Sequence, residues 1–193
     1  MTWDELESSC RQCMQCELGA TRTNLVFGVG NPEAEVLFIG EGPGEQEDLR
    51  GEPFVGRSGQ LLDKYLAAID LDRRRNIYIA NMVKCRPPGN RDPKPEEQDL
   101  CLQWLTAQVK LMRPKIIVCL GRIAAQRIIS KDFKVTKEHG MFFEHNGMLR
   151  MGTFHPAALL RNPNQKPDAL ADFLGLREKI QQVCERTYSQ EEQ

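Results

Sequence analysis

The sequence predicts an α/β fold of three layers, in which helices cover both faces of a central, mostly parallel sheet of four strands. Short apolar runs typical of buried strands occur at 36–40, 76–83 and 115–121, and a fourth strand is expected to lead into His155. Between these runs lie longer segments whose apolar residues recur every three or four positions, as in helices that pack on one side. Strands that alternate with helices in this way form parallel sheets covered on both faces.

The helices are expected from capping and spacing signals. Thr2 and Glu5 form a capping box, which predicts a short first helix. Ser58 is suited to cap a second helix, and Pro95 suits the first turn of a third. Two more helices are expected over 121–129 and 168–185. The inward positions of the second helix are Leu61, Leu62, Tyr65, Leu66 and Ile69, and those of the third are Leu100, Trp104, Leu105 and Val109.

Turn signals account for the remaining segments. The Pro- and Gly-rich stretch 86–95 is expected to be a loop. Asn146-Gly147 suits the type I′ turn of a hairpin over 142–151. Pro156 biases His155 toward extended backbone and ends the preceding strand there.

Length and composition favour one domain over residues 1–193, with 186–193 as a frayed tail. The chain is 40% hydrophobic and 27% charged, which is ordinary for a globular protein. No apolar run reaches the ~18–20 residues of a membrane span. The first residues lack the pattern of a signal peptide, so we expect a cytoplasmic protein without a membrane partner. The net charge of −1 gives no general argument for nucleic-acid binding, although 84–94 is locally basic.

A Gly-rich turn follows the first strand, at the edge where parallel sheets bind ligands. Gly40, Gly42 and Gly44 do not complete a dinucleotide fingerprint, because Glu45 stands where the third glycine is required. Pro43 and Glu41 also place rigidity and negative charge where a pyrophosphate needs free amides. The turn therefore predicts a pocket of another kind.

Three further side chains suit a pocket for a flat ring. Phe54 lies in a loop, where it can stack on a base or simply plug the core. Asn81 ends an apolar strand, where its amide can read a polar ligand edge or serve as a cap. His155, at the end of a strand, can donate a hydrogen bond to an oxygen that gains negative charge, or can be structural.

The seven cysteines form an odd set, which argues against a disulfide framework. Cys13 and Cys16 form a CxxC pair, and Cys85 and Cys101 supply a second, widely spaced pair. Four thiolates suit either zinc or an iron–sulfur cluster, and the spacing does not decide between them.

Five motifs in order, together with these four cysteines, resemble the family-four uracil-DNA glycosylases. The motifs are GEGPG at 40–44, EPFVG at 52–56, the strand of Asn81, RPPGNRDP at 86–93 and HPAALLRNP at 155–163. The resemblance covers residues 13 to about 177. It implies the uracil-DNA glycosylase fold, a monofunctional hydrolase of base excision repair and a [4Fe–4S] cluster on Cys13, Cys16, Cys85 and Cys101.

The resemblance also implies roles within the pocket. Phe54 would stack on uracil, Asn81 would read its polar edge, and His155 would stabilise the departing uracil anion. Glu41 would serve as base or as electrostatic support for the sugar cation. Gly42 and Glu47 would shape the side that faces C5 of the base.

DNA is the partner that the resemblance implies, in single- or double-stranded form. Ser58, Arg86, Asn90 and Arg91 are candidates to contact it, as is the segment 157–162, which would fill the vacated base stack or else be the packed first turn of a helix. In that segment the contacts would be Leu159 and Arg161. We expect a monomer, whose abasic product passes to other repair proteins. The rival interpretations are a non-catalytic iron–sulfur module that binds nucleic acid and a nucleosidase for small substrates.

Overall fold

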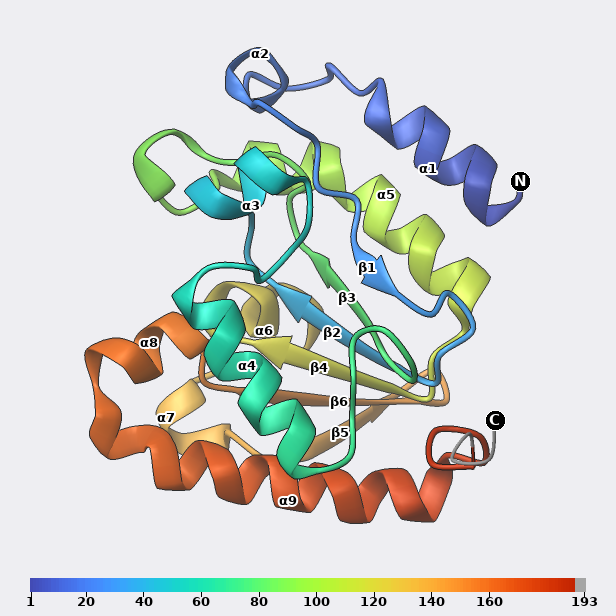
Figure 1. Ribbon diagram of the computed structural model, residues 1–193, viewed down its shortest axis with the longest axis vertical. Helices are drawn as coiled ribbons and strands as arrows, with labels where there is room; N and C mark the ends of the chain where they lie inside the picture. The colour runs from blue at the N-terminus through green and yellow to red at the C-terminus, as the bar shows by residue number, and fades with distance from the viewer. Residues whose placement is uncertain (190–193) are drawn as a thin grey trace.

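The computed structural model describes residues 1–189, in which helices and strands alternate along most of the chain (Figure 1). The helices are α1 (Trp3–Arg11), α2 (Leu18–Thr21), α3 (Glu45–Arg50), α4 (Arg57–Ala68), α5 (Pro95–Met112), α6 (Arg122–Ile128), α7 (Val135–Glu138), α8 (Pro156–Arg161) and α9 (Lys166–Val183), with short 3₁₀ turns η1 (Pro88–Asn90) and η2 (Pro163–Gln165). The strands are β1 (Val29–Gly30), β2 (Val36–Gly40), β3 (Tyr78–Asn81), β4 (Ile116–Leu120), β5 (Phe142–His145) and β6 (Met148–Thr153).

The sheet has the strand order β1-β3-β2-β4-β6-β5. Its four central strands, β3, β2, β4 and β6, are parallel, as the sequence predicts. Two antiparallel strands extend the edges: β1 pairs with β3, and β5 pairs with β6 in the hairpin expected at Asn146-Gly147. The strand β1 is only two residues long, which is too short to give a periodic signal in the sequence.

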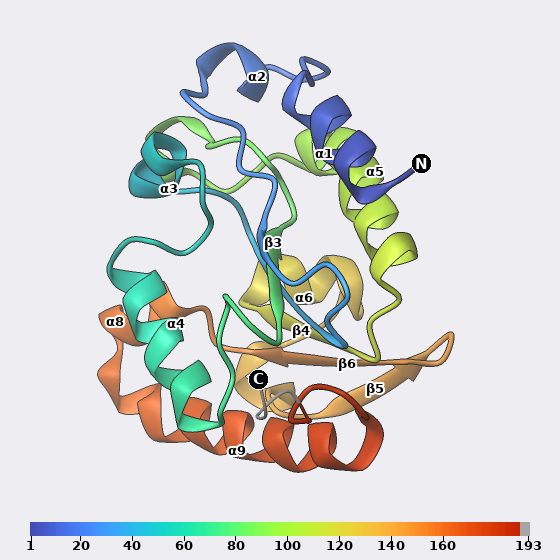
Figure 2. The same cartoon turned by 45° about the vertical axis from the view of Figure 1, so that its right-hand side comes forward.

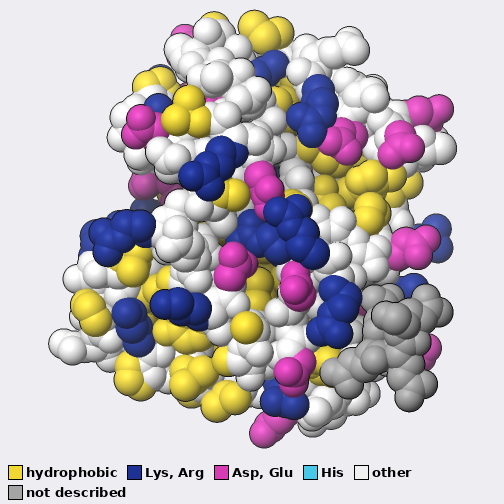
Figure 3. Space-filling view, in the orientation of Figure 1, with side chains coloured by type: hydrophobic (Ala, Val, Ile, Leu, Met, Phe, Trp, Pro, Cys, Tyr) yellow, Lys and Arg dark blue, Asp and Glu magenta, His cyan; other side chains and the backbone are white. Residues whose placement is uncertain are grey.

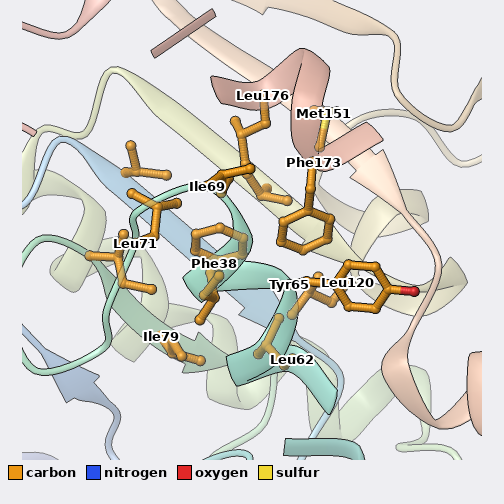
Figure 4. Close-up of a cluster of buried hydrophobic side chains, with 14 of the residues drawn as sticks. Phe38, Leu62, Tyr65, Ile69, Leu71, Ile79, Leu120, Met151, Phe173 and Leu176 are labelled. Atoms are coloured by element: carbon orange, nitrogen blue, oxygen red, sulfur yellow. The ribbon is translucent and has the colours of Figure 1, made fainter. Parts of the chain in front are cut away.

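Helices cover both faces of this sheet, which confirms the three-layer α/β/α fold. On one face, alternate strand residues such as Phe38, Val118 and Met151 pack against α4, α8 and α9 (Figure 4). On the other, the intervening residues such as Leu37, Ile39 and Cys119 pack against α5 and α6. Because successive strand side chains point to opposite faces, the fully apolar runs are explained by burial on both sides.

A third apolar cluster lies beyond the sheet, between α1, α2 and the start of α5 (Figures 1 and 2). It contains Leu6, Leu18, Phe27 and Val83, all at most 1% exposed. The capping box of Thr2 and Glu5 is present at the start of α1, as predicted. This cluster encloses the cysteines that the sequence singled out, so the cysteine region has a packed core of its own.

The structure corrects three sequence predictions. Gly56, not Ser58, is the N-cap of α4, and no side chain caps that helix end. Leu100 is 43% exposed rather than inward on α5. Residues 186–189 are not frayed, since Glu35 accepts hydrogen bonds from the backbone amides of Arg186 and Thr187, each at 2.9 Å. Residues 190–193 lie outside the described residues.

The surface mixes both signs of charge, and the face in Figure 3 shows Lys and Arg side chains interspersed with Asp and Glu. No helix in residues 1–189 is long and apolar enough to cross a membrane.

Candidate active site

A crevice of about 610 Å³ opens at the carboxyl ends of the parallel strands. Glu41 follows β2, Asn81 ends β3, Gly121 follows β4 and His155 lies just beyond β6. The chain reverses its direction of winding between β3 and β4, which lie on opposite sides of β2. Such switch points separate the loops of neighbouring strands and open space for a ligand.

Most of the predicted site residues line this crevice: Glu41, Gly42, Glu47, Phe54, Ser58, Asn81, Asn90, Arg91, His155 and Arg161. Arg86 and Leu159 do not. The lining also includes Asp92 and Arg122, which sequence reasoning missed. Arg122 begins α6, two residues after β4 ends, so its position at the carboxyl end of a parallel strand was the signal available to find it.

Phe54 is held in a fixed, left-handed backbone conformation with φ of 52°. The Arg73 guanidinium donates to the carbonyl oxygens of Pro53 and Phe54, each at 2.6 Å, and is itself buried. Glu47 Oε1 accepts from the amides of Val55 and Gly56, each at 3.2 Å. A non-glycine residue with positive φ is strained unless its surroundings hold it, and such strain is found at functional sites. These contacts fix the ring, which is 5% exposed, at the crevice wall.

Asn81 carries a buried polar group without a protein partner. Asn81 is only 2% exposed, and its side-chain oxygen, Oδ1, has no hydrogen-bond partner within the described residues. Gly40 makes room for it, since a Cβ there would lie 2.5 Å from Asn81 Oδ1 and 2.6 Å from Phe54 Cζ. Leaving a buried acceptor unsatisfied costs ~1–3 kcal/mol, so this amide is suited to a ligand that donates to it.

His155 presents a neutral imidazole to the same crevice. Burial, together with the charge of Arg161, lowers the pKa of His155 to about 4. Its Nδ1 accepts a hydrogen bond from the backbone amide of Ala157 at 3.0 Å, which caps α8. Because an amide can only donate, Nδ1 carries no proton, and the ring proton must be on Nε2. The ring centroid lies 5.6 Å from that of Phe54. The site therefore has an N–H donor beside the aromatic ring.

Glu41 carries a carboxyl group whose pKa is raised close to neutral pH. Burial, and then the adjacent Asp92 carboxylate, raise its pKa to about 7, against the opposing charges of Arg122 and Arg161. Arg122 Nη2 lies 3.1 Å from Asp92 Oδ2. A group with a pKa near the working pH is suited to take up or release a proton during a reaction.

Glu41→Gln is expected to stabilise the protein at pH 8 by about 1–3 kcal/mol, and far less at pH 5. The folded-state pKa of Glu41 lies above its unfolded value of 4.5, so its protonated form contributes stability below pH 4.5 that is lost as the pH rises toward 7. Glutamine imitates the protonated form at every pH. Urea unfolding at both pH values measures the difference, with the exposed neighbour Glu45→Gln as control. A gain of equal size at both pH values would contradict the assignment.

The candidate DNA contacts are less uniform than the sequence suggested. Arg91 is engaged in a two-pronged ion pair with Glu97, at 2.7 and 3.0 Å, and Arg86 Nε donates to Asn90 Oδ1 at 2.8 Å. Arg161 is exposed at the rim of the crevice. Ser58, which does not cap α4, lines the crevice wall. Arg161 is thus the basic side chain of the predicted set that is best placed for a phosphate.

The expectation that Leu159 enters DNA is wrong. Leu159 is 1% exposed and packs in the core shared by α4, α8 and α9. Its alternative interpretation, the packed first turn of a helix, is correct, because α8 runs from Pro156 to Arg161 and turns Leu159 inward. Leu160, which is half-buried on the same helix, lies closer to solvent.

The four cysteines singled out by the sequence line one cavity, although they come from three separate segments. Its walls include Cys13, Cys16, Cys85 and Cys101. All four are free thiols. Arg22 Nη1 and the Lys84 amide each lie 3.3 Å from a cysteine sulfur, those of Cys85 and Cys101 respectively. No three His, Cys, Asp or Glu side chains in residues 1–189 are arranged to hold a single metal ion.

Known proteins of one family match most of this chain. A family model described as the uracil DNA glycosylase superfamily matches residues 27–175. The type-4 uracil-DNA glycosylase of Archaeoglobus fulgidus is 42% identical over 94% of this chain and 92% of its own length. That of Thermotoga maritima is 46% identical over 79% of this chain and 80% of its own, and that of Sulfurisphaera tokodaii 40% identical over 91% and 83%. The chain belongs to the uracil DNA glycosylase superfamily. Within it, the chain is a type-4 uracil-DNA glycosylase.

The superfamily match includes all six strands and every residue that lines the crevice. The cysteine region is only partly inside it, because Cys13 and Cys16 precede residue 27. The match to the type-4 glycosylases extends over most of the chain.

Proposed function

We propose that the crevice removes uracil from single- and double-stranded DNA by hydrolysing the N-glycosidic bond and leaving an abasic site. One observation carries this proposal: a fixed aromatic ring, an unsatisfied buried amide and a neutral imidazole donor meet in one crevice. Each suits a different part of a flipped pyrimidine. The proposal extends the family membership to the residues that do the chemistry.

Recognition of the base is assigned to Phe54 and Asn81. A ring held at the wall gives a flat surface on which an extruded base can stack. The Asn81 amide offers an acceptor and a donor side by side, which match the N3–H and the O4 of uracil. Cytosine presents the opposite pattern at this edge, so it leaves the buried amide unsatisfied and is rejected. Gly42 and Glu47 bound the pocket, and Glu47 acts mainly by holding the backbone that carries Phe54.

Departure of the base is assigned to His155. As the glycosidic bond breaks, negative charge develops on uracil, and a preorganised N–H donor stabilises it. The neutral imidazole of His155 carries its proton on Nε2 for this purpose. Glu41 supplies negative charge near the sugar cation and, with its pKa of about 7, can accept a proton from the attacking water.

The DNA strand would lie along the rim of the crevice. Arg161 and Ser58 are the proposed phosphate contacts, with Asn90 on the opposite loop. Flipping a base costs a few kcal/mol and least at a mismatch, so uracil opposite guanine is the easiest duplex target. We propose that the protein acts as a monomer in the cytoplasm and hands its abasic product to downstream repair proteins.

A [4Fe–4S] cluster fits the cavity of the four cysteines. The donors are all sulfur, and four cysteine thiolates are the ligand set that such a cluster takes. N–H groups surround them: those of Arg22 and Lys84 already face cysteine sulfurs, and the Trp104 indole N–H, which lines the cavity, has no partner within the described residues. Such donors stabilise cluster sulfurs. When bound, the cluster would cross-link the segment before α2, the end of β3 and α5, which braces the loop that carries Asn90.

The test is an excision assay on an oligonucleotide with a single uracil, followed by cleavage of abasic sites with alkali. Strand cleavage is expected at the uracil position, in single strands and opposite guanine, and none with cytosine or thymine at that position. Product from the free nucleoside but not from the oligonucleotide would favour a nucleosidase. Binding without product would favour a non-catalytic module.

A further inference from the structure

Lys84 is a fully buried cation, and no carboxylate in residues 1–189 forms an ion pair with it. Its side chain is 0% exposed, and its Nζ donates to Gln108 Oε1 at 2.7 Å and to the Asn81 carbonyl at 3.2 Å, both neutral acceptors. The ammonium also lies 5.9 Å from the centre of the Phe27 ring. A buried charge is costly unless an opposite charge balances it. Negative charge nearby would offset this cost.

The nearby ionisable groups are cysteine thiols. Lys84 lines the same cavity as Cys85 and Cys101, and Cys10 lies in the apolar cluster that contains both cysteines. Two of these are proposed cluster ligands, and Cys101 also receives the Lys84 backbone amide at 3.3 Å. Four thiolates around an iron–sulfur core carry a net negative charge, which the ammonium would balance. Lys84 would then serve the cluster in two ways: its backbone amide donates a hydrogen bond to a ligand sulfur, and its side chain balances the negative charge.

Lys84 also reaches the base-recognition residue. The carbonyl that its ammonium holds belongs to Asn81, whose side chain lines the crevice. Gln108 completes the network, because its Nε2 donates to the Phe27 carbonyl at 3.0 Å and so orients Oε1 toward the ammonium. The Lys84 ammonium is thus hydrogen-bonded to the end of β3, and the Lys84 backbone amide donates to the sulfur of Cys101 in the cysteine site. A single buried residue connects the two sites.

We propose that Lys84 is a positioning residue that serves as counter-charge to the cluster and anchors the backbone of Asn81 for uracil binding. The inference rests on the cluster and the base contacts proposed above. Lys84 and Gln108 lie outside the crevice lining, and the proposal gives the cluster a structural link to base recognition without any electron transfer.

The test compares iron release and uracil inhibition among three variants. Lys84→Met removes the charge and the Asn81 contact with little change in volume. Gln108→Glu keeps the ammonium and its contact with Asn81 but neutralises the charge with a carboxylate. Lys110→Met removes an exposed lysine from the same helix as Gln108 and is the control. Iron release to a chelator is followed by loss of the visible cluster absorbance, and free uracil is titrated as an inhibitor of excision.

We expect about 10- to 100-fold faster iron release from Lys84→Met and Gln108→Glu, with the control unchanged. Inhibition by uracil should weaken about 10-fold in Lys84→Met only. The proposed role of Lys84 as counter-charge would be overturned by iron release at the parent rate in Lys84→Met or Gln108→Glu. Equal acceleration in the Lys110→Met control would also overturn it. Unchanged uracil inhibition in Lys84→Met would overturn the anchor. If Lys84→Met does not fold, Gln108→Glu decides the counter-charge and Lys84→Arg the anchor, for which parent-like inhibition is expected. A parent protein without iron would instead reject the proposed cluster.

Discussion

Asn81→Ala is expected to lower kcat/KM for uracil excision by about 10⁴-fold while leaving the fold intact. The physical reason is that the crevice holds a buried acceptor, Asn81 Oδ1, that no protein group satisfies. In the proposed complex the uracil N3–H would donate to this oxygen and the Asn81 amide N–H would donate to uracil O4, and alanine removes both contacts at once. Single-turnover excision of a uracil oligonucleotide measures the loss.

The surface amide Asn164→Ala is the control and should keep full activity, because Asn164 is exposed and outside the crevice. Asn81→Asp is a sharper probe: it retains an acceptor for N3–H but cannot donate to O4, so it should recover little of the activity. Excision by Asn81→Ala at the parent rate would remove Asn81 from the base pocket.

His155→Asn is expected to lower the excision rate by about 10²- to 10³-fold while the protein keeps its stability and its affinity for DNA. Asparagine can still accept a hydrogen bond from the Ala157 amide as the cap of α8, but it lacks the Nε2–H that we propose donates to the departing base. The chemical step should therefore suffer alone. Single-turnover rates, DNA binding to a non-cleavable substrate and thermal unfolding together measure this separation.

His155→Ala is the matched comparison, since it removes the donor and the cap together. It should be as slow as His155→Asn and less stable by about 1 kcal/mol, the usual contribution of a cap. If His155→Asn kept the parent rate and His155→Ala lost it, the imidazole would be structural rather than chemical.

The sequence predicted the sheet well because its strands are buried on both faces. Runs such as that at 36–40 are apolar throughout, and few other structures accommodate them. The edge strand β1 was missed, since two residues give no periodicity. Leu100 was misplaced because the buried stripe of α5 runs through Cys101, Leu105 and Met112, which leaves Leu100 beside it, and helical spacing alone does not fix the edge of such a stripe.

The crevice was predictable where a motif coincides with the end of a strand. Glu41, Asn81 and His155 all follow that rule, and the structure places them in one crevice. The prediction that Leu159 contacts DNA was wrong because a short apolar segment has the same sequence pattern whether it faces solvent or the core. Arg73 and Lys84 were not predicted as supports, since the contacts by which they hold Phe54 and Asn81 are to backbone carbonyls, which leave no mark in the sequence.

The clamp on Phe54 has a consequence for selectivity. Arg73 and Glu47 fix the backbone on both sides of the Phe54 ring in the absence of a base. The crevice wall that this ring forms therefore does not change its shape on binding. A rigid pocket binds a base that fits it and excludes a larger base by steric clash. Because the pocket is preorganised, binding of the correct base loses little conformational entropy. Discrimination against bulkier pyrimidines is thus built during folding of the protein, and temperature should weaken it only when the clamp itself begins to loosen.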